Sequence, residues 1–318
     1  MRKFVLSLLL AVVATAAFAA YPERPITMII AYSPGGGTDL VARALAPYLE
    51  KYLGGGAKVV IVNRAGAGGE VGFAALASSP ADGYTIGFVN TPPLMTIPIE
   101  RKAQFQALGF DFIGNIVDDP SNFAVHSESD IRTLNDLAAF ARANPGKATV
   151  GTTGIGSDDH LAMLIFERIA GVTMTHVPFK GSADVRTALA SRQIMVAAIN
   201  VGEALQAIRG GLPLRNIGQF SPGRSMLAPD LPTGKEQGFD FVLSSLRGMA
   251  APKGLPADVR ERLAKAAAQA AADPEFQAQA VKVFAPLRYL SPSQFEAEIR
   301  AGDAQFRKMW SEMPWGEK

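Results

Sequence analysis

The sequence predicts an α/β fold divided into two lobes, each with a mostly parallel sheet flanked by helices. Two stretches, residues 26–52 and residues 148–169, carry this prediction, and each runs from a short apolar strand through a glycine turn into a helical pattern. Around them, strands alternate with helices, which is typical of parallel sheets. Because the two units are far apart in the chain, we expect each lobe to present a helix N-terminus to a shared cleft.

The first unit is organised around the glycine turn at residues 33–39. The preceding run, residues 28–31, is short and apolar on both faces, which favours a buried strand. A turn of three glycines leaves the first N–H groups of the following helix pointing beyond the strand end, where the helix dipole favours an anion. The alternative is a tight turn in which Thr38 or Asp39 only caps the helix.

The rest of the first lobe continues the alternation. A strand at residues 58–62 leads into a second glycine-rich turn at residues 63–69, a helix follows, and a third strand covers residues 84–88. Residues 90–93 lie just beyond the end of this strand. Open α/β sheets bind their ligands at such strand ends.

The chain is expected to cross between the lobes twice. We place the first crossing around residues 118–120 and the return in the proline- and glycine-rich segment 221–232. Lobe 1 then comprises residues 20–121 and 222–318, and lobe 2 comprises residues 122–221. The elements predicted beyond the first crossing are helices at 134–142, 157–170, 183–191, 257–272 and 291–310, and strands at 148–152, 174–178 and 194–199.

Residues 1–19 have the pattern of a cleaved signal peptide. Arg2 and Lys3 form a basic start, an apolar run follows to about residue 15, and Ala17 to Ala19 has the small-x-small form of a cleavage site. The apolar run is short for a membrane-spanning helix. We therefore expect an exported protein whose mature form is soluble.

Composition excludes several classes of protein. Without Arg2 and Lys3 the 31 basic residues fall to 29, which equals the 29 acidic residues, so the mature chain is close to neutral and nucleic acid is not an expected partner. The chain has no cysteine, which excludes disulfides and cysteine-based catalysis or metal binding. Its 48% hydrophobic content supports apolar cores, and its length suits two domains.

Short motifs in a fixed order resemble a known family over nearly the whole mature chain. They are Tyr21-Pro-x-Arg-Pro-Ile26, Ser33-Pro-Gly-Gly-x-x-Asp39, Asn63-Arg-x-Gly-Ala-Gly-Gly69, Asp82-Gly-Tyr-Thr85, Pro145-Gly-Lys147, Gly151-x-x-Gly-x-Gly-Ser157, His176-Val-Pro-Phe-Lys-Gly181, Leu231-Pro-Thr233 and Ala251-Pro-Lys-Gly-x-Pro256. No single motif is specific, but together they resemble the substrate-binding proteins of tripartite tricarboxylate transporters, also called the Bug family.

The resemblance implies a periplasmic-binding-protein fold of the Venus-flytrap, type II-like kind in the periplasm. It implies a monomeric binding protein that delivers a small carboxylate or dicarboxylate to membrane permease subunits. Such a protein is not an enzyme and has no cofactor or metal. One ligand carboxylate is then held by the two glycine turns through backbone N–H groups, hydroxyls and water. The residues that we assign to the ligand on this basis are Ser33, Gly35, Gly36, Asp39, Thr91, Thr152, Thr153, Ser157 and Asn200.

Arg247 departs from the family pattern. Many relatives have an aromatic pair before the glycine that is Gly248 here. An arginine at this position has the right geometry for a two-pronged bond to a distal carboxylate, which would make the ligand a dicarboxylate. The alternative is a surface or inter-lobe arginine, and the sequence leaves both open.

An exported enzyme is the rival class, either a hydrolase or a nucleotide-dependent oxidoreductase that uses the glycine-rich loops with Ser157 and His160. The glycine spacing at residues 151–156 differs from the dinucleotide fingerprint, and the chain has no phosphate-loop lysine motif. Ser157 fits a helix cap, and Asp158 and Asp159 are favourable charges at a helix start. Adjacent residues on a helix diverge, which argues against a metal site at residues 158–160.

Overall fold

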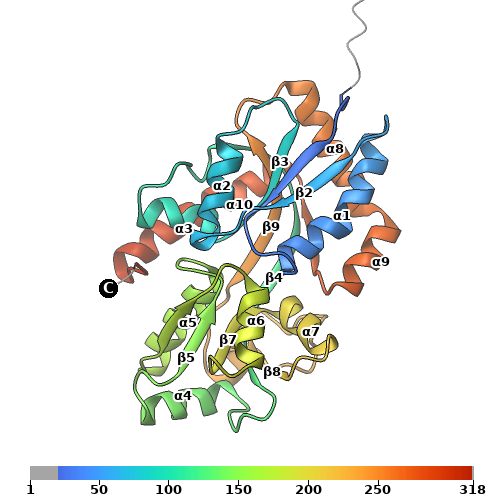
Figure 1. Ribbon diagram of the computed structural model, residues 1–318. Helices are drawn as coiled ribbons and strands as arrows, with labels where there is room; N and C mark the ends of the chain where they lie inside the picture. The colour runs from blue at the N-terminus through green and yellow to red at the C-terminus, as the bar shows by residue number, and fades with distance from the viewer. Residues whose placement is uncertain (1–20, 317–318) are drawn as a thin grey trace, which may run out of the picture.

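The computed structural model describes residues 21–316, and the predicted signal peptide at residues 1–19 lies outside this range. The described chain forms two lobes, one built mainly from the beginning and end of the chain and the other from its middle (Figure 1). Two long strands run from one lobe into the other. The predicted α/β fold in two lobes is confirmed.

Lobe 1 contains a six-stranded portion of the sheet covered by helices on both faces. Its strands, in sheet order, are β2 (Val59–Asn63), β1 (Ile26–Ile30), β3 (Thr85–Asn90), β9 (Ser244–Pro252), the first part of β4 (Phe110–His126) and β10 (Leu287–Leu290). Its helices are α1 (Gly37–Leu53), α2 (Glu70–Ala77), α3 (Pro93–Glu100), α8 (Ala257–Ala272), α9 (Pro274–Lys282) and α10 (Pro292–Glu312).

Lobe 2 repeats the plan on a smaller scale. Its strands, in sheet order, are β6 (Thr175–Pro178), β5 (Thr149–Thr152), β7 (Val196–Asn200), the second part of β4 and β8 (Leu214–Gln219). Its helices are α4 (Leu134–Ala143), α5 (Asp158–Ala170), α6 (Ser182–Ala190) and α7 (Val201–Arg209).

The sheets are mixed and not mostly parallel as predicted. β1, β2 and β3 are parallel to one another, and so are β5, β6 and β7. Every pairing made by β4 and β9 is antiparallel. The strand–helix alternation therefore predicts the parallel halves correctly but does not reveal the strands that carry the chain between the lobes.

β4 is one continuous strand that belongs to both lobes. It pairs with β9 as far as Pro120 and then with β7 from Ser121 onward. Proline has no backbone N–H to donate, so it is tolerated where a strand changes its partner. The chain thus first crosses between the lobes within one strand, β4, whose pairing partner changes from β9 to β7 after Pro120.

Residues 222–243 pack on lobe 2, whereas the sequence prediction assigns them to lobe 1. Phe239 is buried in the core of lobe 2 and Phe241 packs against that core. The Gln237 side chain accepts a hydrogen bond from the Leu134 N–H at 2.9 Å. The chain returns only in β9, where Ser244 pairs with Pro120. The second boundary therefore lies near residue 243, because the proline-rich segment is an excursion within lobe 2.

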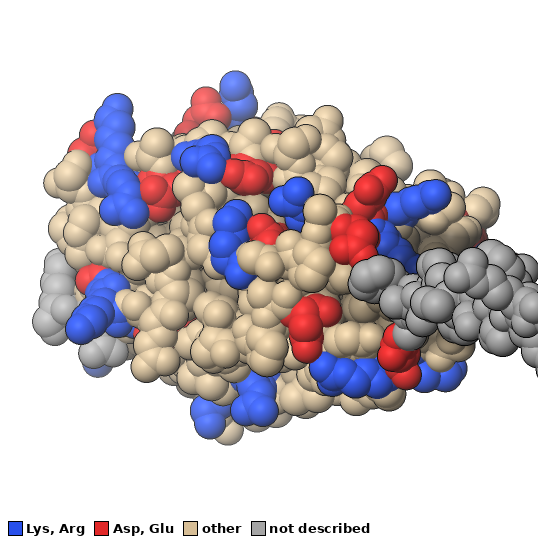
Figure 2. Space-filling view, turned by 90° about the horizontal axis from the view of Figure 1, so that it is seen from above, with Lys and Arg blue, Asp and Glu red and all other residues tan. Residues whose placement is uncertain are grey.

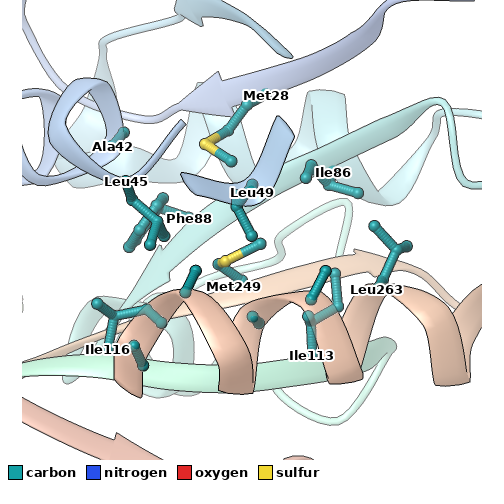
Figure 3. Close-up of a cluster of buried hydrophobic side chains, with 14 of the residues drawn as sticks. Met28, Ala42, Leu45, Leu49, Ile86, Phe88, Ile113, Ile116, Met249 and Leu263 are labelled. Atoms are coloured by element: carbon teal, nitrogen blue, oxygen red, sulfur yellow. The ribbon is translucent and has the colours of Figure 1, made fainter. Parts of the chain in front are cut away.

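The main core of lobe 1 fills the space between the sheet and helices α1 and α8. Figure 3 shows Met28 and Phe88 from the sheet facing Leu45 and Leu49 of α1 in this core. A second core, on the other face of the sheet, extends across the lobe junction, since Leu161 of α5 is fully buried in it. Trp315, near the C-terminus, packs in the same cluster with Phe306 and Trp310.

On the face shown in Figure 2, Lys and Arg side chains are interspersed with Asp and Glu side chains, so this face has no large patch of a single charge. Within residues 21–316, no helix combines the length and the apolar character needed to cross a membrane.

Gly248→Ala should destabilise lobe 1 by about 1–3 kcal/mol, the usual cost of overpacking a core. A Cβ at this position would lie 2.2 Å from the ring of Phe295, a fully buried residue of α10. Urea unfolding would measure the loss. Gly223→Ala is the matched control, because its Cβ would meet nothing within 4 Å, and equal stability of the two variants would contradict this packing.

Candidate ligand-binding site between the lobes

The lobes enclose a polar cavity at the junction where β1, β3 and β5 end. Its volume is about 20 Å³, room for about one water molecule, so the structure is a closed form. The cavity is lined by side chains and backbone of both lobes. The lining residues are Tyr32, Gly36, Gly37, Thr38, Asn90, Thr91, Pro93, Thr153, Asp158, Ser182, Asn200, Glu203, Ser245 and Arg247.

Direct hydrogen bonds hold the closed form on both flanks of the cavity. On the α6 side, Arg186 Nη2 donates to the Gly35 carbonyl at 2.6 Å and Ser33 Oγ donates to Asp184 at 2.8 Å. On the α3 side, Thr96 Oγ1 donates to the Gly156 carbonyl at 2.7 Å. These contacts join residues of lobe 1 to residues of lobe 2, so they exist only when the lobes are closed.

The first glycine turn places the N-terminus of α1 at the cavity. Gly35 adopts φ +78°, a conformation that favours glycine, and α1 begins at Gly37 without a side-chain cap. The Gly37 N–H donates to Oε1 of Glu203 at 3.1 Å. A carboxylate from lobe 2 therefore sits at the helix N-terminus, which is the kind of partner that this position favours.

Asp39 supports this turn from behind. It accepts hydrogen bonds from the Gly35 N–H at 2.9 Å, from Asn63 at 2.9 Å and from Arg43 at 3.0 Å. Burial opposes its charge, but these bonds outweigh burial and lower its pKa. Asp39 is thus an ionised residue that fixes the turn.

The end of β3 contributes two polar residues, Asn90 and Thr91. The Asn90 amide nitrogen donates to Thr38 Oγ1 at 2.8 Å, while its oxygen is buried without a hydrogen-bond partner. Thr91 Oγ1 accepts from the Leu246 N–H at 2.9 Å. Both residues line the cavity from lobe 1.

The second glycine turn lies opposite, at the start of α5. Thr153 lines the cavity and donates through Oγ1 to Asp159 at 2.6 Å. Ser157 caps α5 by accepting from the His160 N–H at 3.1 Å, and Thr152 turns toward His176, with 2.7 Å between Oγ1 and Nε2. Ser157 and Thr152 therefore shape the turn. Of these three residues, only Thr153 lines the cavity.

Arg247 lies at the centre of the junction, with only 2% of its surface exposed. Its Nη2 is 3.2 Å from Asp119 and 3.1 Å from Glu203, and it donates to Asn200 Oδ1 at 2.9 Å. Burial disfavours the guanidinium charge, yet the neighbouring carboxylates raise its pKa overall. Arg247 is an inter-lobe arginine at the cleft, and this terminal nitrogen is already bound to carboxylates of the protein.

Buried carboxyl groups outnumber the arginines around it. Burial is the main cause that raises the pKa of Asp119 to about 7 and that of Asp158 to about 6. The pKa of Asp159 is raised further above its ordinary value by burial and by the charges of Asp158 and Glu203. Two of these groups, Asp158 and Glu203, line the cavity.

The structure divides the predicted site residues into two sets. The first set lines the cavity and consists of Gly36, Thr91, Thr153, Asn200 and Arg247. The second set surrounds the cavity through the turn and inter-lobe contacts given above and consists of Ser33, Gly35, Asp39, Thr152 and Ser157.

Sequence reasoning missed the two acidic lining residues, Asp158 and Glu203, and several polar ones, among them Ser182. Asp158 lies in the first turn of α5, where the helix dipole favours its charge. Glu203 is the N3 residue of α7, and its Oε2 accepts from the Asn200 N–H at 3.2 Å. Ser182 follows a third strand-to-helix turn, after β6. Its place at a strand end was the available signal.

Ser157 and His160 do not form a nucleophile–base pair. Ser157 Oγ donates to the Gly154 carbonyl at 2.8 Å, whereas His160 Nδ1 accepts from the Gly156 N–H at 3.2 Å. The His160 ring stacks on His176 at 3.9 Å, and burial lowers the pKa values to about 3 and about 4, respectively. The two histidines are packed, neutral residues of lobe 2.

Two α/β lobes, joined by crossing strands and closed over a polar cavity, define a periplasmic-binding-protein fold. The solved structure of the periplasmic binding protein BugD superposes with a TM-score of 0.85 at 28% identity, covering 94% of this chain and 100% of that chain. Residues 41–291 match the model of the TctC family, described as the tripartite tricarboxylate transporter family receptor. The chain belongs to this family, so it is a binding protein and not an enzyme.

Other relatives agree. A Cupriavidus necator protein, named UPF0065 protein in gbd 5'region, is 31% identical over 276 residues, covering 86% of this chain and 83% of its own. Protein BugT of Bordetella pertussis is 33% identical over 255 residues, covering 76% of each chain. The solved structure of R. palustris Rpa4515 with adipate is 25% identical, with a TM-score of 0.86, and covers 92% of this chain and 97% of its own.

Asp159→Asn should stabilise the protein more at pH 8 than at pH 5. The folded-state pKa of Asp159 is raised, so its contribution to stability is full below the ordinary pKa and is lost as the pH rises through the folded pKa. Asparagine has no such dependence and can still accept from Thr153. We expect a difference of about 1–3 kcal/mol between the two pH values.

Denaturant unfolding of both proteins at pH 5, 6.5 and 8 would measure this. The contribution of the two histidines is common to both proteins and cancels in the difference. Asp240→Asn, at a side chain that is 68% exposed, is the control for a simple loss of charge. A stability gap that is constant with pH would contradict a raised pKa of Asp159.

Proposed function

We propose that this protein is the periplasmic receptor of a tripartite tricarboxylate-type transporter and captures a small carboxylate between its lobes. Backbone N–H groups at the start of α1, together with hydroxyls from both lobes, hold the ligand carboxylate. Closure then presents the loaded receptor to membrane permease subunits. Family membership supports this role, and so does the adipate in the R. palustris relative.

The observation that carries the proposal is the hydrogen bond from the Gly37 N–H to the Glu203 carboxylate. In this bond the α1 N-terminus donates to a carboxylate in a buried setting. Thr91, Thr153 and Ser182 line the same cavity. Charge-assisted hydrogen bonds contribute about 1.5–3 kcal/mol each, so three or four of them support micromolar binding, roughly −8 kcal/mol, after the costs of association.

The purified protein should bind a small carboxylate and leave it chemically unchanged. A thermal-shift screen against propionate, succinate, malate, adipate, alanine, aspartate and glutamate is the first measurement. A ligand present at 100 times its Kd stabilises the folded state by about 2.7 kcal/mol, which a melt detects. Mass spectrometry of the incubated ligand checks for turnover, and conversion by the pure protein would overturn the receptor role.

Gly181→Val should weaken binding about tenfold or more by opposing closure, without unfolding either lobe. Gly181 has extended backbone, and a Cβ there would lie 3.0 Å from the Ser33 backbone nitrogen on the other lobe. The obstruction exists only in the closed form. Calorimetry would give the affinity, and small-angle scattering would show whether saturating ligand still decreases the radius of gyration.

Gly223→Ala serves as the control here as well, because its Cβ contacts nothing. Wild-type affinity and wild-type contraction in Gly181→Val would argue against closure around the ligand.

A further inference from the structure

We infer that Glu203 is an internal competitor of the ligand: its carboxylate closes the ligand-free lobes onto the α1 N-terminus and has to leave when a ligand carboxylate binds there. This rests on the proposed function, because it concerns the regulation of that same site. The inference comes from the atoms that Glu203 binds, from the space around them and from the elements that carry them.

Glu203 offers the cleft the same chemical group as the proposed ligand. Its Oε1 accepts from the Gly37 N–H at 3.1 Å and lies 3.1 Å from Nη2 of Arg247. Helix N-termini and guanidinium groups are both donors that favour carboxylates. Glu203 comes from α7 in lobe 2, whereas Gly37 begins α1 in lobe 1 (Figure 1). A side chain of one lobe therefore occupies a carboxylate position on the other lobe.

The first glycine turn shows which of its donors depends on closure. The Gly35 N–H donates to Asp39 at 2.9 Å and the Gly36 N–H donates to the Ser33 carbonyl at 3.3 Å, both within lobe 1. Parting the lobes leaves these two bonds in place. Of the three glycine N–H groups, only that of Gly37 donates to lobe 2, so only this one is released for a ligand when the lobes open.

The closed cavity has no room for two carboxylates. Its volume of about 20 Å³ holds one water molecule, and even acetate is larger. Packing around Gly37 is tight, because a Cβ there would collide with the side chains of Glu203 and Arg247. A ligand carboxylate therefore reaches the Gly37 N–H only after Glu203 has withdrawn.

Opening of the lobes allows this withdrawal without isolating a charge. Oε2 of Glu203 accepts from the Asn200 N–H within lobe 2, so the side chain keeps its place as a cap when α7 moves away. Arg247 also keeps a partner, because Asp119 lies 3.2 Å from its Nη2 and belongs to the neighbouring crossing strand. The large cost of leaving a buried charge unpaired is thus avoided, and the contact of Glu203 with lobe 1 is reversible.

The rival interpretation is a permanent cross-link, in which Glu203 stays in place when the ligand is bound. The two interpretations predict opposite changes in affinity. Removing a competitor strengthens ligand binding, whereas removing a bond that the liganded closed form needs weakens it.

Distances between the lobes of the ligand-free protein test the contact. The chain has no cysteine, so spin labels at Val71→Cys in α2 and Ile169→Cys in α5, residues 48% and 44% exposed, mark one site on each lobe. Double electron–electron resonance should resolve an open and a closed population, and Glu203→Gln should decrease the closed one about threefold or more. Glutamine can still accept from the Asn200 N–H. Glu203→Asp keeps the charge but is one methylene shorter, and it should open the lobes in the same way.

Asp158→Asn is the matched control. It removes a carboxylate from the same cavity, but the bonds of Asp158 with Ser121 and Asn200, at 2.8 Å and 2.7 Å, lie within lobe 2. The closed population should therefore not decrease in this variant. Wild-type distances in both Glu203 variants, or equal opening in Asp158→Asn, would overturn the inference and leave the proposed function standing.

Calorimetry with succinate, malate, adipate and glutamate tests the competition. Whichever of these binds the wild type should bind Glu203→Gln about tenfold more tightly, because no internal carboxylate has to leave first. Equal or weaker binding by a folded Glu203→Gln protein would overturn the inference in favour of the cross-link, while binding by the wild type would still support the receptor role. Failure of all four to bind either protein would overturn both.

Discussion

The ion pairs of Arg247 with Asp119 and Glu203 are the interaction on which the closed form depends. Arg247 is on β9 and Asp119 on β4, the two strands that cross between the lobes, while Glu203 comes from α7 in lobe 2. Buried charges are tolerated only when paired, and removing one partner of a buried pair usually costs about 3–5 kcal/mol. The ion pair of Arg247 with Asp119 joins the two crossing strands, β9 and β4. The contact of Glu203 with the α1 N-terminus joins one lobe to the other.

Glu203 thus has two roles that reinforce each other. One oxygen caps its own helix by accepting from Asn200, and the other accepts from Gly37 across the cleft. Because the first bond orients the side chain, little further conformational freedom is lost when the second forms. In the closed form the Gly37 N–H at the start of α1 therefore already donates to a carboxylate, that of Glu203.

Much of the fold follows from patterns in the sequence, and the failures have identifiable causes. The glycine turns predict the parallel units because strand, turn and helix are local signals. β4 escapes prediction because it is buried through both lobes and contains Asp118, Asp119 and Pro120, residues that normally argue against a strand. The sequence does not place residues 222–243 correctly, because proline and glycine mark turns but do not indicate which core Phe239 and Phe241 join.

The site could be predicted only in part for a related reason. Turn residues such as Gly36 and Thr153 can be recognised in the sequence as candidate site residues, because they follow strand ends. In the sequence, Asp158 and Glu203 are already accounted for as acidic residues in the first turn of a helix, so nothing marks them as site residues. Only the closure of the two lobes brings them close to Arg247. Their shared burial is a property of the assembled lobes, which single-sequence patterns do not contain.

The two flanks of the cleft differ in chemistry, and this has a thermodynamic consequence. Both flanks make polar bonds between the lobes, those of Arg186 with Gly35 and of Thr96 with Gly156, but only the α3 flank also buries Leu161 in a core that holds Trp315. Apolar contacts weaken on cooling and carry a large heat-capacity change, whereas polar bonds depend less on temperature. The apolar part of the α3 flank therefore contributes less to closure in the cold, while the polar bonds of both flanks are less affected.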